Sequence, residues 1–140
     1  ERLRNQNIDN WINLHDIYSD VIEKMKYLNN QNRLLIATLK DRKSVRLILK
    51  NYGININKEN ILDQSQISSK LEALDFFVEK TKIKKNELCF IDDNVTHLIE
   101  PHRNGYEVYL SGWSKIIDEH MNIAIKENIN LLKNINEGNF

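Results

Sequence analysis

The chain has 140 residues, the size of one ordinary domain. With 41% hydrophobic and 29% charged residues it can bury a core, which excludes collagen-like and disordered classes of protein. Twenty basic residues balance twenty acidic residues, so the net charge favours neither nucleic acid nor an anionic membrane as a partner. No apolar run approaches the roughly 18–20 residues of a membrane helix, and we expect no membrane partner.

The single cysteine cannot form a disulfide within the chain. Cys89 lies in an apolar run, residues 88–91, which favours a small buried hydrophobic residue over a reactive thiol. The first five residues lack the apolar stretch of a signal peptide. These features predict a cytoplasmic protein.

Helical periodicity alternates with short apolar runs along the chain, a pattern typical of βα units and a mainly parallel sheet. Strands are predicted at residues 34–37, 61–62, 88–91 and 106–110. Helices are predicted at residues 16–29, 41–53, 69–81, 95–104 and 116–135, the last as one long amphipathic helix.

Three residues mark the expected helix ends. Asp41 can cap the N-terminus of the second helix, and Gly53 stands where a C-terminal glycine belongs. Ser69 opens the S-x-x-E pattern of a capping box that Glu72 completes.

Polar side chains follow the predicted strands at the points where ligands gather in open α/β sheets. Thr38 follows one strand, Asp92 and Asp93 follow another, and Lys70 begins the helix between them. The hydroxyl and ammonium groups can bind phosphate oxygens, and paired carboxylates suit Mg²⁺. The set therefore indicates a phosphate and magnesium site.

Three segments follow one another in an order that resembles the haloacid dehalogenase (HAD) superfamily. Residues 34–38 read Leu-Leu-Ile-Ala-Thr, Lys70 stands alone before a helix, and residues 89–94 read Cys-Phe-Ile-Asp-Asp-Asn. They resemble motifs II, III and IV of that family, and the likeness covers about residues 16–113. The resemblance implies an α/β fold with a Rossmann-like three-layer parallel sheet. It also implies a Mg²⁺-dependent phosphatase that forms an aspartyl-phosphate from a small phosphorylated metabolite.

By this resemblance, Thr38 would bind the transferring phosphoryl group and Lys70 would stabilise the charge on the nucleophile and the phosphate. Asp93, together with Asp92, would hold Mg²⁺. A phosphoryl transition state chiefly requires positioning and charge neutralisation, which such residues supply.

Two features depart from the family pattern. Many members carry a second acidic residue four positions after the motif IV aspartate, where this chain has His97. The D-x-D of motif I, whose first aspartate is the covalent nucleophile, does not occur in the chain. Asp9, Asp16 and Asp20 are isolated and follow no apolar strand, so none of them is a candidate nucleophile.

By the resemblance, the motif I strand lies between the strands that end at Thr38 and at Asp92. Without it, buried backbone groups would lack partners, each at a cost on the order of 1–3 kcal/mol. A missing N-terminal segment, a complementing chain or a rearranged fold would account for the gap, and we favour the first. Residues 1–15 would then be the remnant of a helical cap or linker, and residues 16–140 the α/β core with a long C-terminal helix.

Other interpretations remain open. A non-catalytic binding or regulatory module, or an inactive fragment, would keep the phosphate pocket without the nucleophile. A receiver-type signalling domain is disfavoured because receivers place their acidic pair early and their lysine last. Taken singly, Thr38 suits a turn, Lys70 a solvated helix start, and residues 92–94 a turn with a helix cap. His97, His102 and His120 are expected on the surface or on helix faces.

Overall fold

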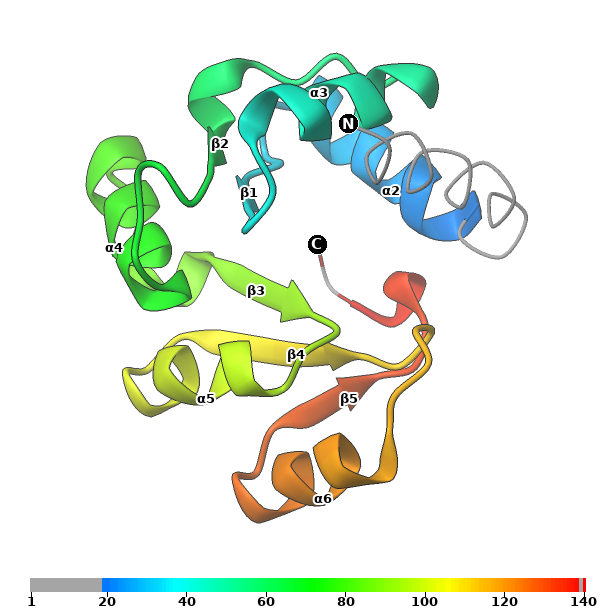
Figure 1. The fold of residues 1–140 in the computed structure, drawn as a ribbon, viewed down its shortest axis with the longest axis vertical. Coiled ribbons are helices and arrows are strands. Elements are labelled where there is room, and N and C mark those ends of the chain that lie inside the picture. Colours follow the sequence, from blue (N-terminus) through cyan, green and yellow to red (C-terminus); the bar gives the residue numbers. More distant parts are fainter. Residues whose placement is uncertain (1–18, 139) are drawn as a thin grey trace. The chain divides into compact units, whose positions relative to one another are not determined.

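A computed structural model describes residues 19–138 and residue 140. The chain is a mixed α/β protein, with five α-helices and two small parallel sheets in the described part (Figure 1). It divides between Gln66 and Ile67 into two compact units. We call the described residues 19–66 the first unit and the remaining described residues the second unit. The segment 1–15, expected to be a cap remnant or linker, lies outside the described residues.

The first unit contains two helices and a two-stranded parallel sheet. Its elements are α2 (Ser19–Asn30), β1 (Ile36–Ala37), α3 (Arg42–Asn51), the 3₁₀ turn η1 (Lys58–Asn60) and β2 (Ile61–Leu62). The register of the sheet joins Ile36 to Ile61 and Ala37 to Leu62. The predicted strand at 61–62 is confirmed, and the strand predicted at 34–37 is confirmed at its last two residues.

Apolar residues from both helices, from the connection after α3 and from β2 form the core of the first unit. The buried members are Ile22, Leu49, Ile54, Ile56 and Ile61. Burial of one such side chain contributes roughly 1.5–3 kcal/mol. Both expected ends of α3 are confirmed. Asp41 Oδ1 accepts the N–H of Ser44 at 2.8 Å, and Gly53 has a left-handed φ of 77°.

The second unit is a three-stranded parallel sheet with helical connections. Its elements are α4 (Lys70–Thr81), the turn η2 (Lys85–Glu87), β3 (Cys89–Asp92), α5 (Thr96–Arg103), β4 (Glu107–Ser111), α6 (Asp118–Lys126), β5 (Asn130–Leu132) and the turn η3 (Ile135–Glu137). The strand order is β3-β4-β5, so β3 lies at an edge of this sheet. The register joins Asp92 to Leu110 and Tyr109 to Asn130.

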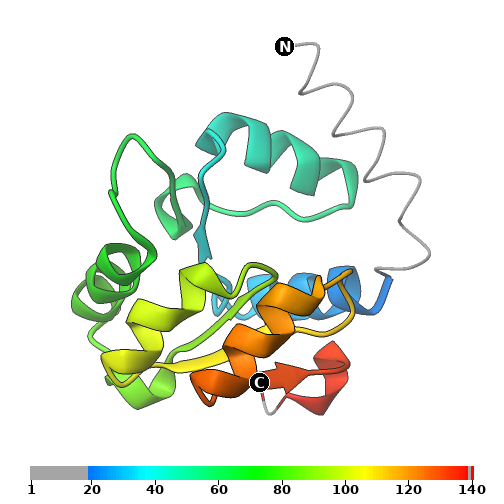
Figure 2. The same cartoon turned by 60° about the horizontal axis from the view of Figure 1, so that its bottom comes forward.

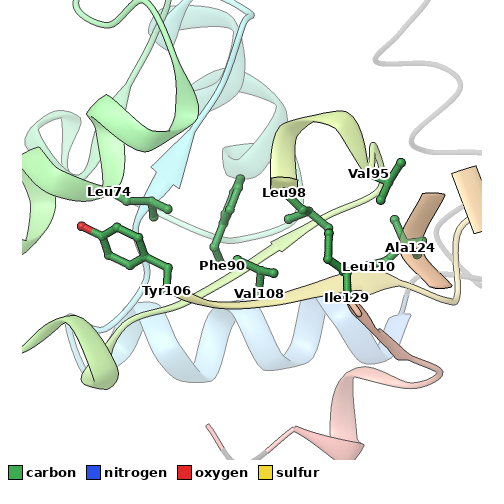
Figure 3. Packing of buried hydrophobic residues seen from close by; sticks show 9 residues of the cluster. All are labelled: Leu74, Phe90, Val95, Leu98, Tyr106, Val108, Leu110, Ala124 and Ile129. Atoms are coloured by element: carbon green, nitrogen blue, oxygen red, sulfur yellow. The ribbon is translucent and has the colours of Figure 1, made fainter. Parts of the chain in front are cut away.

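One face of this sheet carries the core of the second unit (Figure 3). Phe90, Val108 and Leu110 project from it and pack against Leu98 of α5 and Ala124 of α6. Both helices lie on this side of the sheet (Figure 2). Helices that connect parallel strands return to the sheet in this way, and all three strands therefore end at the same edge.

The predicted cap of α4 at Ser69 is confirmed, but Glu72 bonds Ser68 and not Ser69. Ser69 Oγ accepts the N–H of Glu72 at 3.1 Å. The Glu72 carboxylate bonds the N–H and the hydroxyl of Ser68, one residue earlier than in a standard capping box. Lys70 is thereby fixed as the first residue of the helix.

The prediction of one long helix at residues 116–135 is wrong. Helix α6 ends at Lys126, and Asn128 takes a left-handed φ of 58°. The N–H of Ile129 then bonds the carbonyl of Ala124 at 2.8 Å, which closes the last turn. Asparagine tolerates the left-handed conformation that stops a helix, and the apolar residues after it form β5.

None of the helices within the described ranges combines the length and the apolar character needed to cross a bilayer.

Candidate functional site

The carboxylate of Asp92 stands at the end of β3, where the chain turns into α5. Its Oδ1 accepts the N–H of Asn94 at 2.8 Å. Asn94 Oδ1 in turn accepts the N–H of Thr96 at 3.0 Å and the Thr96 hydroxyl. Aspartate and asparagine commonly bond the backbone two residues on, so this turn is built by local side chains. Residues 92–94 thus form the turn that their sequence suggested. The N-cap residue of α5 is Val95, and Asn94 bonds the first residue of that helix from one position earlier.

Lys70 reaches the same carboxylate from the start of α4. Its Nζ lies 3.7 Å from Asp92 Oδ2, and the two side chains are only 10% and 11% exposed. Burial lowers the pKa of Lys70, and the charge of Asp92 opposes this effect. The structure therefore brings together two of the predicted site residues that lie 22 positions apart in the sequence.

Asp93 is the second carboxylate at this strand end. Its pKa is raised, first by burial and then by the hydrogen bond and the negative charge of Asp92. Two adjacent carboxylates resist holding two negative charges together, and a bound cation relieves that repulsion.

These residues fit Mg²⁺ that keeps most of its water. In the described part of the chain, no group of three or more histidine, cysteine, aspartate and glutamate side chains is arranged to hold a metal. Mg²⁺ is often bound through one or two carboxylates, with waters and substrate phosphates completing the octahedron. Asp92 and Asp93 can supply that small ligand set, whereas an all-protein cage is not available among the described residues.

His97 also belongs to this group. The sequence analysis expected it on the surface or on a helix face, and noted it four positions after Asp93, where a second acidic residue is common in the family that the chain resembles. His97 lies in the first turn of α5, and its Nδ1 is 3.1 Å from Asp92 Oδ2. Because an ionised carboxylate only accepts hydrogen bonds, Nδ1 is the donor in this contact. The signal in the sequence was its position five residues after Asp92. The turn at residues 92–95 and the start of α5 bring the imidazole of His97 back to the end of β3.

Thr38 belongs to the first unit, whereas Lys70, Asp92 and Asp93 belong to the second. Its N–H bonds the carbonyl of Leu62 at 2.9 Å, which extends the pairing of β1 with β2. Its Oγ1 accepts the N–H of Lys40 at 3.0 Å. The hydroxyl oxygen thus supports the turn after the strand, and its hydrogen remains a donor.

A comparison of the chain with protein-family models, with curated proteins and with solved structures found no match. The chemistry of the site therefore follows from its residues. An ammonium group, two carboxylates and an imidazole meet at the end of a parallel strand. Such a set can bind a hydrated divalent cation and an anion together.

Proposed function

We propose that the chain carries the metal and phosphate part of a Mg²⁺-dependent phosphatase site of the HAD type. The observation that carries this proposal is the meeting of Lys70 with Asp92 at the end of β3, beside Asp93. A small phosphomonoester is the substrate, since one ammonium group and one pair of metal-binding carboxylates suit a single phosphoryl group.

The proposal also includes the arrangement of strands around β3. Strand β3 is a short apolar run of the kind found inside parallel sheets, yet it lies at the edge of its sheet in the described part. An edge strand of this kind can accept another strand. We infer a Rossmann-like three-layer sheet in which a further strand, from an N-terminal segment or a complementing chain, joins β3 and carries D-x-D.

In this proposal Lys70 neutralises charge on the phosphoryl oxygens, and a phosphate-binding role for Thr38, in the first unit, rests on the sequence resemblance alone. Asp92 and Asp93 hold Mg²⁺, which supplies further charge neutralisation when bound. The nucleophile is an aspartate of the D-x-D strand. Its carboxylate attacks phosphorus and the ester P–O bond breaks, and the departing alkoxide takes a proton from water. A second water molecule then cleaves the acyl phosphate, which releases inorganic phosphate and restores the carboxylate.

A second candidate is a binding or regulatory module of the same fold. The observation that favours it is the absence of D-x-D from the 140 residues. Such a module, or an inactive fragment, binds Mg²⁺ and phosphate without turnover.

The metal part of the proposal is tested by Asp93→Asn. The substitution removes a charge and one ligand oxygen, and it should abolish Mg²⁺ binding as measured by titration calorimetry. The matched control is Asp118→Asn, which changes an exposed aspartate in the first turn of α6. Equal Mg²⁺ affinity in Asp93→Asn and the unmodified chain would remove Asp93 as a metal ligand.

The phosphate part is tested by Lys70→Ala. We expect weaker binding of inorganic phosphate in a folded protein, because Asn94 and His97 still donate to Asp92. Lys126→Ala, in the exposed last turn of α6, is the control for losing one lysine. If Lys70→Ala binds phosphate as the control does, Lys70 is a structural helix-start residue.

A further inference from the structure

Helix α6 carries an exposed apolar stripe next to the side that packs on the sheet. Ala124 of this helix is buried in the core of the second unit (Figure 3). Ile117, which directly precedes the helix, and Ile125 are 53% and 72% exposed. Met121 lies midway between them in the sequence and is half-buried. Residues four positions apart lie on one side of a helix, so these three side chains form a continuous stripe.

A polar row runs along α6 beside the apolar stripe. It consists of Asp118, Asn122 and Lys126, which follow the same four-residue spacing and are all exposed. Among the described residues, neither Asp118 nor Lys126 takes part in an ion pair. The row is therefore negative at the N-terminal end of the helix, neutral in the middle and positive at the C-terminal end.

We propose that α6 binds α6 of a second copy of this chain in antiparallel order, which makes the chain a weak homodimer. In a twofold pair of this kind, each contact between two different residues occurs twice. Ile117 meets Ile125 of the partner subunit, and the two Met121 side chains meet at the axis. The inference goes beyond the proposed function, because it uses no residue at the end of β3.

The polar row specifies a second copy as the occupant of this surface. In an antiparallel pair of helices, the row beside the apolar stripe lies next to the same row of the partner helix, running in the opposite direction. Asp118 then lies beside Lys126 of the partner subunit, and Asn122 lies beside its counterpart. Two ion pairs thus flank the apolar contact, one at each end, and the row is complementary to itself.

The size of the surface indicates a weak association. Helix α6 has nine residues and is about 14 Å long. A contact of this length is smaller than the roughly 1,200–2,000 Å² of a standard interface, so the dimer should form only at high protein concentration. Well below its dissociation constant the chain is a monomer. Asp118→Asn and Lys126→Ala therefore remain valid controls for the site at β3.

The charges at the ends of α6 can also stabilise the helix itself. An acidic residue in the first turn and a basic residue in the last turn both favour a helix through its macrodipole. A test of the dimer must therefore separate pairing between two chains from stability within one chain. Reversal of one charge at a time, followed by mixing of the two variants, makes this separation.

The experiment follows the full chain by sedimentation equilibrium at protein concentrations up to the order of 1 mM, where weak association is populated. Asp118→Lys and Lys126→Asp each place like charges side by side at both ends of the pair. Each variant alone should associate about tenfold more weakly than the unmodified chain. An equimolar mixture of the two variants should associate about as well as the unmodified chain, because every charge again faces its opposite.

The apolar stripe is tested by Ile125→Ala. This substitution removes apolar area from the pair twice and should weaken association about tenfold, and alanine's higher helix propensity preserves α6. The matched control is Leu47→Ala in α3, because Leu47 is also a large exposed apolar residue, and this variant should associate like the unmodified chain.

A chain that stays monomeric at the highest concentration overturns the inference, whether the stripe is bare or covered by another protein. A mixture that associates no better than its separate variants also overturns it, since the charges then act only within each helix. Equal association of Ile125→Ala and Leu47→Ala would show that the dimer uses a different surface. None of these outcomes depends on Mg²⁺ or phosphate binding, so failure of the proposed function is measured separately.

Discussion

Individual residues at the end of β3 differ in how strongly the surrounding protein constrains them. Asp92 is bonded by a backbone N–H and by His97, and it faces Lys70. The pKa of its neighbour Asp93 is raised, first by partial burial and then by the hydrogen bond and the negative charge of Asp92. The two adjacent aspartates thus differ in their surroundings, and a bound cation would stabilise the ionised form of Asp93 by relieving its repulsion from Asp92.

Cys89, three residues before Asp92, should be nearly inert as a nucleophile in the folded chain. Burial, assisted by the charge of Glu107, raises the pKa of its thiol to about 12 from an ordinary value of 9.0. The thiolate is the reactive form, so alkylation at pH 7.5 should be on the order of a thousandfold slower than in the denatured chain. Iodoacetamide labelling followed by mass spectrometry measures both rates.

The denatured chain in the same assay is the control for intrinsic thiol reactivity. Labelling of the native chain at the denatured rate would show that Cys89 is exposed to reagent. The sequence interpretation of Cys89 as a small hydrophobic residue would then be wrong.

Residue types and their order predicted Lys70, Asp92 and Asp93 as neighbours, because carboxyl ends of parallel strands meet at one edge. The role of His97 was not predictable in the same way. Its contact depends on the path of the turn through Asn94, and a pattern of residue types does not give that path. Thr38 was predicted with two possible roles, and its bond to the N–H of Lys40 supports the turn role without removing its donor.

At the scale of elements, helix α3 shows how two carboxylates can serve one N-terminus. Asp41 caps it and bonds both the N–H and the hydroxyl of Ser44. Asp63, after β2, accepts the N–H of Arg42 at 2.8 Å through Oδ2, and its Oδ1 accepts from Ser65. Negative charge at this end of a helix is favourable, and here it also ties β2 to α3.

Asp63 should make the first unit sensitive to acid. Hydrogen bonds from the Ser65 hydroxyl and the Arg42 N–H lower the pKa of Asp63 below its ordinary value of 3.8. A lowered pKa in the folded state contributes stability above pH 4, which is lost as the pH falls through the folded pKa. Asp63→Asn should therefore be less stable than the unmodified chain at pH 7, by an amount that shrinks at pH 3.

Urea unfolding followed by circular dichroism at both pH values measures this difference. Asp118→Asn, which changes an exposed carboxylate outside the first unit, is the control for the loss of one carboxylate. An equal difference at pH 7 and pH 3 would mean that the ionised form of Asp63 is not the source of the stability.

Within the described residues, α6 is an element whose end sequence periodicity predicted incorrectly. Apolar residues continue at helical spacing past Lys126, and periodicity alone therefore extends α6. The left-handed Asn128 ends the helix, and the pairing of β5 with β4 then fixes the extended conformation. Periodicity shows which residues are apolar, whereas the end of α6 depends on the backbone conformation of Asn128.

At the scale of the whole molecule, the sequence predicted alternating helices and parallel strands, and both described sheets are parallel. Sheet order is less accessible to sequence analysis, because it depends on pairing between separate segments. The described strands form two sheets, β1-β2 and β3-β4-β5. The place of a further strand beside β3 therefore remains part of the proposal.

The 140-residue chain alone should bind Mg²⁺ and phosphate without turnover. It contains no D-x-D, and the phosphoryl group has no aspartate nucleophile to attack it. Incubation with p-nitrophenyl phosphate and Mg²⁺, followed by absorbance of the released phenolate, measures turnover. Asp93→Asn serves as the control for a contaminating phosphatase. Release that this substitution abolishes would show that another residue is the nucleophile and would contradict the mechanism.

The parallel order of the second unit has a consequence for how its sheet assembles. Each strand pairs with the next strand along the chain, as Cys89 with Glu107 and Tyr109 with Asn130. Each pairing therefore closes only a short loop that a single helix fills, and the entropy lost on closure is modest. All three strands and both connecting helices of this sheet lie between Cys89 and Leu132, so the sheet can assemble from one continuous stretch of the chain.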